Sequence, residues 1–330
     1  MQPLLLTMGD PTGIGPELII KTLLDQSLEQ INRPIQVVGD IAILCRAGKI
    51  FGCEGTSERL RDGLYSLHFG DKQLIVHSCS ELDLTSIHYG QPDMTCGKAM
   101  ADYVEYAIVR CLDKTAAGIV TCPINKAAIN AAGYHFPGHT ELLAERCGIE
   151  KVVMMLAGEH LKVCLVTTHL PYRDVPAKLS HEEILQTIRI TAKALRQQFG
   201  IQQPRLAVLA LNPHASENGL FGDEEETIIT PAIAAAQAEG IAAKGPHSAD
   251  TLFHFAVKGA YDAVICMYHD QGLIPLKLLH FDDAVNVTLG LPIVRTSVDH
   301  GTAYDLAGSG TANTASLVAA LKMAEHMADN

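Results

Sequence analysis

The stretch RLAVLALNPHASENGLFGDEEETIITPAIAAAQA, residues 205–238, contains the unit from which the fold is built. It begins with a short apolar run, passes through a polar segment that contains glycine, and ends in a helical pattern over 224–238. A continuously apolar run is typical of a parallel strand that is covered on both faces, and the helix after it can cross over to the next strand. This stretch therefore predicts one α/β unit.

The same alternation of strand and helix extends over the whole chain. Further helical patterns cover 97–114, 180–199 and 312–327, and the strand candidates are PLLLTM, PIQVVG, QLIVH, AGIVT, KVVMMLA, LKVCLVTT, RLAVLAL, DAVICMY and AVNVTL. The pattern predicts an α/β fold of largely parallel sheets with helices on both faces. Nine or more strands exceed one doubly wound layer, so we expect two lobes with a cleft between them. The expected lobes are 1–125 plus 305–330, and 126–304.

Composition excludes several classes of protein. The chain has 330 residues, 48% of them hydrophobic, and a formal charge of −12 without a basic block, which argues against a nucleic-acid partner. No apolar run approaches ~18 residues, and the N-terminus lacks the basic flank of a signal peptide, so neither a membrane span nor secretion is expected. The nine cysteines form no CxxC pair and several lie in apolar runs, which predicts reduced thiols in a cytoplasmic protein.

Three histidines follow predicted buried strands. His169 follows LKVCLVTT, His214 follows RLAVLALNP, and His269 follows DAVICMY. Ligands of open α/β sheets bind at the carboxyl ends of the strands, and three imidazoles with an open position are typical of a catalytic zinc site. The alternative is that each histidine satisfies a hydrogen bond of its loop. Their spacing matches no local zinc signature, so the ligands would come from separate loops.

Acidic residues lie close to two of these histidines in the sequence. Asp270 directly follows His269, and Asp250 opens ADTLF after a Gly-Pro turn. A carboxylate beside a metal can orient a ligand or move a proton, whereas Asp250 could also cap a helix. The long polar segment after His214 is of a length more often found in functional loops, although its acids could cap the next helix.

Two segments are candidates for binding an anion. PGHTELLAER places His139 and Thr140 at the start of a helix, where free N–H groups favour phosphate or carboxylate, although Thr140 could be a plain N-cap. Lys277, Asn286 and Arg295 are nine residues apart in apolar surroundings. A cation in such surroundings needs an anionic partner, either a substrate or an internal carboxylate.

The first strand and turn, MGDPTGIGPELII, contain Gly13 and Gly15 but have Glu17 and Leu18 where the dinucleotide fingerprint requires its third glycine. The Rossmann motif is therefore absent, and a tight turn into a helix with Pro16 near its start explains these glycines.

Six segments together resemble one family. GDPTGIGPE, PGHTELLAE, TTHLPYRDV, LNPHASENGLFGDEE, MYHDQGLIPLK and RTSVDHGTAYDLAG occur in the order and spacing of the 4-hydroxythreonine-4-phosphate dehydrogenases of vitamin B6 biosynthesis. The C-terminal HGTAYDLAGSGTAN also resembles the cofactor loop of isopropylmalate and isocitrate dehydrogenases. The resemblance implies their fold, which has a dinucleotide site of its own and does not require the Rossmann motif.

The resemblance implies a role for each matching residue. It makes His169, His214 and His269 ligands of one divalent metal, with zinc first and magnesium or cobalt as alternatives. It implies a homodimer whose second lobe forms the interface and whose subunits share the active site, each giving His269 to the other. The remaining positions are His139, Thr140, Lys277, Asn286 and Arg295 for the substrate, His300, Gly301, Thr302, Ala303 and Asn313 for NAD or NADP, and Lys126, Asp250 and Asp270 for catalysis.

The implied reaction is metal-dependent oxidation of 4-phosphohydroxy-L-threonine by NAD(P)⁺. The product, 2-amino-3-oxo-4-phosphooxybutanoate, is a β-ketoacid and loses CO₂ to give 3-amino-2-oxopropyl phosphate. The main alternative is the same chemistry on a phosphorylated four-carbon sugar acid, D-threonate or D-erythronate 4-phosphate, or on an aromatic cis-dihydrodiol carboxylate. Leu273 and the segment 307–310 favour the vitamin B6 branch. A zinc hydrolase and a non-catalytic binding protein are the remaining alternatives.

Overall fold

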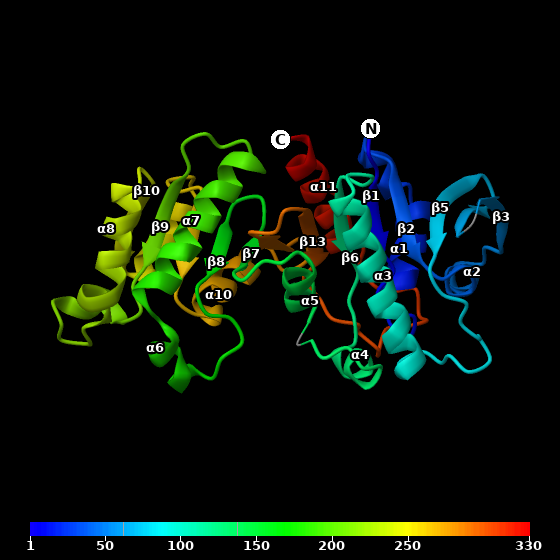
Figure 1. Ribbon diagram of the computed structural model, residues 1–330, viewed down its shortest axis with the longest axis horizontal. Coiled ribbons are helices and arrows are strands. Elements are labelled where there is room, and N and C mark those ends of the chain that lie inside the picture. Colours follow the sequence, from blue (N-terminus) through cyan, green and yellow to red (C-terminus); the bar gives the residue numbers. More distant parts are fainter. Residues whose placement is uncertain (62, 137) are drawn as a thin grey trace. The chain divides into compact units, whose positions relative to one another are not determined.

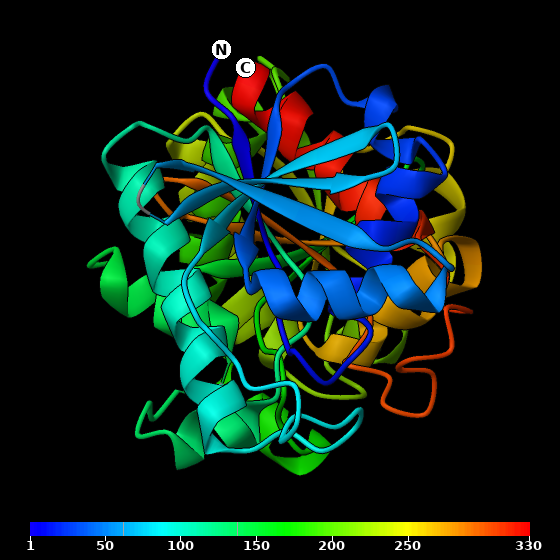
Figure 2. The same ribbon diagram turned by 90° about the vertical axis from the view of Figure 1, so that its right-hand side faces the viewer.

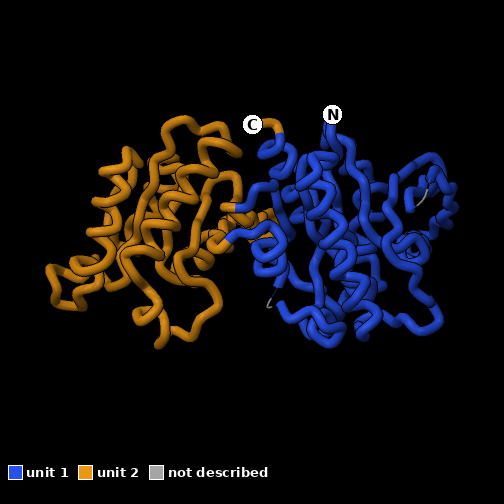
Figure 3. Tube along the Cα trace, viewed as in Figure 1, with its two compact units in different colours: residues 1–149, 291–328 blue, residues 150–290, 329–330 orange. Residues whose placement is uncertain are grey.

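Figure 1 shows a computed structural model of the chain, in which residues 1–61, 63–136 and 138–330 are described. The chain forms two compact units (Figure 3). Unit 1 comprises Met1–Ile149 and Leu291–Ala328, and unit 2 comprises Glu150–Gly290 and Asp329–Asn330. Both units are layers of helices on largely parallel strands, so the predicted α/β fold is confirmed.

The strands of unit 1 lie in the order β13-β6-β1-β2-β5-β4-β3. The first five are parallel, and β4 and β3 form an antiparallel hairpin at the edge. Central strands such as β1 are buried at every residue, as expected for strands covered on both faces. The bounds are β1 Leu4–Thr7, β2 Ile35–Gly39, β3 Gly55–Arg61, β4 Leu64–Phe69, β5 Lys72–Ser78, β6 Gly118–Thr121 and β13 Val294–Val298.

The helices of unit 1 cover both faces of these strands. The crossover from β1 to β2 and the crossover from β5 to β6 run in opposite directions across the sheet, so right-handed connections place their helices on opposite faces. Figure 2 shows α3 on one side of the strands and α11 on the other. The bounds are α1 Gly15–Leu24, η1 Ser27–Gln30, α2 Ile41–Ile50, α3 Met94–Leu112, α4 Lys126–Ala131, α5 His139–Arg146 and α11 Ala315–Asp329.

The strands of unit 2 lie in the order β10-β9-β11-β8-β7-β12. The first four are parallel, β7 is antiparallel to β8, and β12 is antiparallel to β7. Their apolar side chains form a core with α9 and α10 that includes Val163, Ala207 and Val264. The bounds are β7 Val153–Ala157, β8 Lys162–Leu165, β9 Arg205–Leu209, β10 Ala242–His247, β11 Ala263–Cys266 and β12 Val285–Leu289.

Helices and short turns connect the strands of unit 2. The longest of these helices, α7, is preceded by the N-cap residue Ser180, whose hydroxyl accepts a hydrogen bond from the Glu183 N–H. The bounds are η2 Tyr172–Asp174, α6 Val175–Lys178, α7 His181–Gln197, η3 Pro213–Glu217, η4 Glu225–Ile229, α8 Thr230–Ala238, α9 Ala249–Ala256 and α10 His269–Leu279. Within the described ranges, no helix is both long and apolar enough to cross a membrane.

The units divide the chain at other positions than the sequence-based lobes 1–125 plus 305–330, and 126–304. Residues 126–149 belong to unit 1, because α4 and α5 pack against α3. Residues 291–304 also belong to unit 1, because β13 pairs with β6. In the sequence, no linker-like segment separates α4 and α5, or β13, from the residues that follow or precede them in unit 2. For this reason the composition of the sequence does not mark the boundaries between the units.

A glycine on α3 allows α4 to pack close to it. A Cβ atom at Gly97 on α3 would come within 2.0 Å of the Ala128 carbonyl oxygen on α4, so only glycine allows this approach. The backbone of α4 therefore rests directly on α3, and this contact fixes the start of α4, where Lys126 lies.

A buried histidine in unit 1 makes stability depend on pH. The His77 ring is bonded to Gln36 and Tyr106, and burial, with help from the Arg110 and Arg61 charges, lowers the pKa of His77 to about 4. The unfolded chain therefore binds a proton near pH 6.5 that the folded chain does not, and acidification from pH 6.5 towards 4 must favour unfolding.

We expect the melting temperature of the wild type to fall more steeply than that of a His77→Gln variant between pH 7 and 4.5. Differential scanning fluorimetry of both proteins in the same buffers measures this difference. If the difference between the two melting temperatures stayed constant from pH 7 to 4.5, protonation of His77 would not be the cause of the acid sensitivity.

Candidate active site

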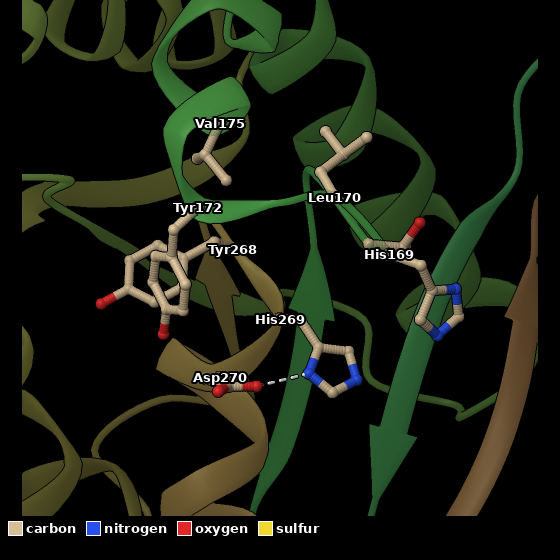
Figure 4. Close-up of a pocket in the computed structure, with 8 residues that line it drawn as sticks. His169, Leu170, Tyr172, Val175, Tyr268, His269 and Asp270 are labelled. Atoms are coloured by element: carbon tan, nitrogen blue, oxygen red, sulfur yellow. Dashed lines mark hydrogen bonds and ion pairs between the residues drawn. The ribbon is translucent and has the colours of Figure 1, made fainter.

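The three predicted metal ligands all lie in unit 2, at one edge of its sheet. His169, His269 and His214 follow β8, β11 and β9, which are neighbouring parallel strands with β11 in the middle. Parallel strands end at the same edge, so the strand order brings the three loops together. The His169 and His269 rings are adjacent, with their centroids 5.5 Å apart (Figure 4).

Asp270 contacts the ring of His269. Its Oδ1 lies 2.7 Å from His269 Nδ1, within hydrogen-bond distance. A proton held at Nδ1 by a carboxylate leaves Nε2 with its lone pair, which is the usual arrangement for a histidine that binds a metal. The geometry therefore suits Asp270 for orienting His269.

A cavity of about 220 Å³ lies beside these two histidines. Tyr172 and Tyr268 form one wall, where their rings meet edge to face with centroids 5.3 Å apart (Figure 4). The cavity thus combines aromatic surface with the imidazole and carboxylate groups of His169, His269 and Asp270.

His214 begins an unusual left-handed segment. Residues 214–218 all have positive φ, between 47° and 65°, although none is glycine. The nearest carboxylate to the His214 ring is Asp250, with Oδ2 4.0 Å from Nδ1. A left-handed residue other than glycine costs roughly 1–2 kcal/mol, so the surrounding structure must hold this segment in place.

Glu225 anchors the residues that lead into this segment. Its side chain is buried, and Oε1 accepts hydrogen bonds from the Leu211 and Asn212 N–H groups, each at 2.8 Å. Oε2 accepts another from the Asn212 amide at 2.9 Å. The sequence allows the acids of this loop to serve only as caps of the following helix. The structure shows that Glu225 also fixes the backbone of the loop.

The described residues of one chain do not assemble the predicted ligands into a metal centre. No group of three or more His, Cys, Asp or Glu side chains in ranges 1–61, 63–136 and 138–330 is arranged to hold a metal ion. His169 and His269 lie together, whereas His214 pairs with Asp250. The donors are those that zinc prefers, and at most part of the set comes together within one chain.

Unit 1 gathers three of the other predicted residues around a buried cation. Arg295 on β13 is 3% exposed, and its Nη2 donates to the Thr121 hydroxyl at the end of β6 at 2.8 Å. The charges of Arg295 and Lys126 both act on the ring of His139. A Cβ atom at Gly138 would come within 3.6 Å of Lys126 Nζ, which places the ammonium group at the start of α5.

This cluster is electrostatically prepared for an anion. Burial, together with Arg295 and Lys126, lowers the pKa of His139 well below its ordinary value, so the ring is neutral at pH 7. Burial also lowers the pKa of Arg295 to about 10, which leaves the guanidinium charged. His139 Nε2 is buried and has no hydrogen-bond partner among the described residues. An anion would supply a partner for this nitrogen, in a cluster whose nearby acid, Glu141, acts on Arg295.

Thr140, Lys277 and Asn286 complete the predicted substrate set. Thr140 is the second residue of α5, close to His139. Lys277 and Asn286 belong to unit 2, on α10 and β12. Asn286 Oδ1 is buried without a partner in the described part of the chain, while the Lys277 ammonium lies 6.0 Å from the Phe281 ring centroid. The predicted set is thus divided between the units.

The predicted cofactor residues form a loop of unit 1 that packs on the turn between β1 and α1. The Ile14 N–H donates to the Thr302 carbonyl at 3.1 Å, and a Cβ atom at Gly13 would come within 3.0 Å of the same oxygen. Ala303 has φ 43°, and a Cβ atom at Gly301 would meet nothing within 4 Å. The backbone at Gly301 is therefore open to a ligand.

The residues at the two ends of this loop, His300 and Asn313, each make a hydrogen bond to a residue close by in the sequence. His300 Nδ1 lies 3.0 Å from the Gly301 carbonyl, and His300 Nε2 is buried with no partner among the residues described. Asn313 accepts a hydrogen bond from the Ala315 N–H at the start of α11. An open backbone beside an orphaned imidazole nitrogen fits a polar ligand such as a nicotinamide cofactor.

Sequence reasoning missed three residues that join these segments: Asp10, Asn125 and Tyr304. Tyr304 donates to Asp10 Oδ2 at 2.6 Å and accepts from the Asn125 amide at 2.7 Å. Burial raises the pKa of Asp10, and burial and Asp10 raise that of Tyr304 to about 12. Asp10 and Tyr304 lie within the GDPTGIGPE and HGTAYDLAG motifs, but the sequence contains no signal that they meet.

Comparison with known proteins identifies the family. The profile of the family described as "Pyridoxal phosphate biosynthetic protein PdxA" matches residues 30–324. The chain belongs to this family. The family recognised from the six motifs is therefore confirmed.

Several relatives in the PdxA family cover nearly the whole chain. The chain is 55% identical to 4-hydroxythreonine-4-phosphate dehydrogenase of Geobacter metallireducens, over 98% of this chain and 95% of that protein. A crystal structure of the Klebsiella pneumoniae enzyme of that name matches with a TM-score of 0.87 and 39% identity, over 100% and 98%. Terephthalate 1,2-cis-dihydrodiol dehydrogenase of Burkholderia xenovorans matches with a TM-score of 0.67 and 28% identity, over 98% of each chain.

Proposed function

We propose that the chain is a dehydrogenase that oxidises 4-phosphohydroxy-L-threonine at C3 with NAD⁺ or NADP⁺. The observation that carries the proposal is the cluster of buried Arg295, exposed Lys126 and neutral His139 in a chain 55% identical to a protein named for this substrate. The more distant likeness to a dihydrodiol dehydrogenase, at 28% identity, favours the phosphorylated amino acid over an aromatic substrate.

The cluster in unit 1 is suited to the phosphate or the carboxylate of this substrate. The Arg295 guanidinium can bind two anionic oxygens side by side, and the Lys126 ammonium lies close to Gly138, the residue before the first turn of α5. Thr140 would add a hydroxyl, and the family resemblance assigns Lys277 and Asn286 to the same substrate. The orphaned His139 Nε2 supports this assignment, because as an N–H it can donate to an anionic oxygen, whereas Asn286 Oδ1 accepts and would need a donor such as the substrate amino or hydroxyl group.

The loop of His300, Gly301, Thr302, Ala303 and Asn313 is proposed to bind the nicotinamide cofactor. The open backbone at Gly301 and the partnerless His300 Nε2 support this role. When bound, the nicotinamide would accept the hydride from C3, and a divalent metal on the C3 oxygen would lower the pKa of the hydroxyl and stabilise the charge that develops during loss of CO₂.

We propose that the metal, zinc by its donor set, is held by His169 and His214 together with His269 from a second copy of the chain. The outer face of α10, which starts at His269, supports a homodimer. Ile274, Leu278 and the following Phe281 are 65%, 85% and 75% exposed, which is costly for large apolar side chains unless another surface covers them. A shared site would also explain why one chain leaves His214 beside Asp250.

The proposed proton transfers fall to Lys126. Asp270 and Asp250 face Nδ1 of His269 and His214, which suits both acids for orienting imidazoles. Lys126 lies instead beside His139, at the start of α4, where its side chain can reach a bound substrate. As the neutral amine it would take the hydroxyl proton, and the ammonium group formed in this way would later return that proton to the product enol.

The test is formation of reduced nicotinamide at 340 nm with 4-phosphohydroxy-L-threonine, D-threonate 4-phosphate and an aromatic cis-dihydrodiol carboxylate, each with and without a chelator. Turnover that favours the amino acid and stops with the chelator supports the proposal. A preference for the sugar acid would move the chain to a different substrate with the same chemistry, and no turnover of any substrate would refute a dehydrogenase role.

A further inference from the structure

The Tyr304 hydroxyl connects three segments of unit 1 that are far apart in the sequence. It donates to Asp10 on the turn after β1 and accepts from Asn125 on the loop before α4. Tyr304 itself follows directly after the proposed cofactor loop. One hydroxyl group therefore uses both its donor and its acceptor capacity to join the three segments.

The partner on the first segment is rigid. Asp10 is fully buried, and its other oxygen, Oδ1, accepts from the Thr12 N–H and the Thr12 hydroxyl, each at 2.8 Å. The turn is also bonded to the loop through Ile14 and Thr302. Because a buried carboxylate without donors is costly, the Tyr304 bond holds the loop against the turn.

The partner on the second segment positions a proposed catalytic group. Asn125 Oδ1 accepts from the Ala128 N–H at 2.8 Å and so caps α4, while its amide nitrogen donates to Tyr304. The first residue of α4 is Lys126. The same asparagine side chain therefore contacts the end of the cofactor loop and orients the start of the helix that presents Lys126.

From these contacts we infer that Tyr304 is a positioning residue, which holds the loop 300–303 in the conformation that binds the nicotinamide cofactor and aligns it with the start of α4. The inference rests on the proposed function of the loop. Tyr304 would not touch the reacting atoms; it acts through Thr302 and Asn125.

The experiment compares Tyr304→Phe with Tyr106→Phe. The Tyr106 hydroxyl, on α3, also makes a half-buried hydrogen bond in unit 1, with His77 Nδ1 at 2.7 Å, and this partner belongs to β5 rather than to the loop or α4. Both variants lose one hydroxyl, but Tyr304→Phe loses two hydrogen bonds, one of them to a buried carboxylate, so its melting temperature should fall further than that of Tyr106→Phe. Binding of NAD⁺ and NADP⁺ is measured by isothermal titration calorimetry, and KM for cofactor and substrate from initial rates.

We expect the cofactor Kd of Tyr304→Phe to rise roughly tenfold, as when a hydrogen bond to a charged group no longer holds the binding conformation. Its cofactor KM should rise in parallel, with the substrate KM changed less than about twofold because Arg295 and His139 remain in place. Tyr106→Phe should keep the wild-type Kd. Equal cofactor Kd values in wild type and Tyr304→Phe would overturn the inference.

If Tyr304→Phe does not fold, Asn125→Ser takes its place. Serine can still cap α4 but is too short to reach Tyr304; because the bond from Tyr304 to Asp10 remains, a smaller rise in cofactor Kd is expected, and an unchanged Kd refutes the alignment of the loop with α4. A wild-type protein that binds neither NAD⁺ nor NADP⁺ would instead refute the proposed function of the loop, which keeps the two failures distinct.

Discussion

Replacing His214 with alanine is expected to abolish metal binding and to lower kcat/KM by about a thousandfold or more, since a bound divalent ion supplies several kcal/mol of transition-state stabilisation. The fold should persist, because the His214 side chain is 62% exposed and contributes little to the core. Metal content by atomic emission after dialysis, and initial rates with and without added zinc, measure the two effects.

The matched control for this variant is His254→Ala, since His254 is an exposed histidine of the same unit, on α9. It should retain metal and activity. Melting temperatures of all proteins are compared in chelator, so that loss of bound metal does not itself appear as loss of stability. A His214→Ala protein that is fully active in chelator-treated buffer would remove His214 from the metal site.

Replacing Arg295 with methionine is the second large effect that we expect. Methionine fills much of the same space, so the packing between β13 and β6 is preserved while the charge is lost. Removing one partner of a buried, hydrogen-bonded charge pair costs about 2–5 kcal/mol, which corresponds to a roughly 30- to 5,000-fold loss in kcat/KM. Most of the loss should be in the substrate KM, because Arg295 is proposed to bind the substrate anion.

Two further variants make the Arg295 result specific. Arg295→Lys keeps the charge but not the planar fork, so it should fall between the wild type and Arg295→Met. Arg205→Met removes an exposed arginine that pairs with Asp262, and it should leave KM unchanged. An Arg295→Met enzyme with the wild-type substrate KM and normal inhibition by inorganic phosphate would show that the substrate anion binds elsewhere.

The sequence predicts the strands that are apolar and central, and misses those that are not. The runs PLLLTM and DAVICMY become β1 and β11 because they are buried on both faces. Four strands escaped prediction: β3 is an exposed edge strand, β4 pairs with it in a hairpin, β10 contains a Gly-Pro pair, and β13 carries Arg295 in its interior. Their pairing depends on neighbours far away in the chain, which hydrophobic periodicity does not record.

The candidate site, too, is predictable from the sequence only where it depends on local pattern. That three histidines stand at one edge of a sheet is readable from the sequence, because each follows an apolar run and parallel strands share an edge. The group of Asp10, Asn125 and Tyr304 is not readable, because three loops separated by more than a hundred residues bring it together. The separation of His214 from the other two ligands is equally a property of tertiary structure.

The left-handed turn at 214–218 has a consequence for the engineering of this enzyme. Its five residues hold a conformation that glycine adopts without strain, so Ala215→Gly is among the most direct ways to make the protein more resistant to heat. The same substitution would loosen the backbone beside His214. A substitution in this loop that raises the melting temperature should therefore lower activity. A more heat-resistant enzyme is better obtained by substituting glycine at left-handed positions far from the loop, such as Lys114, just after α3.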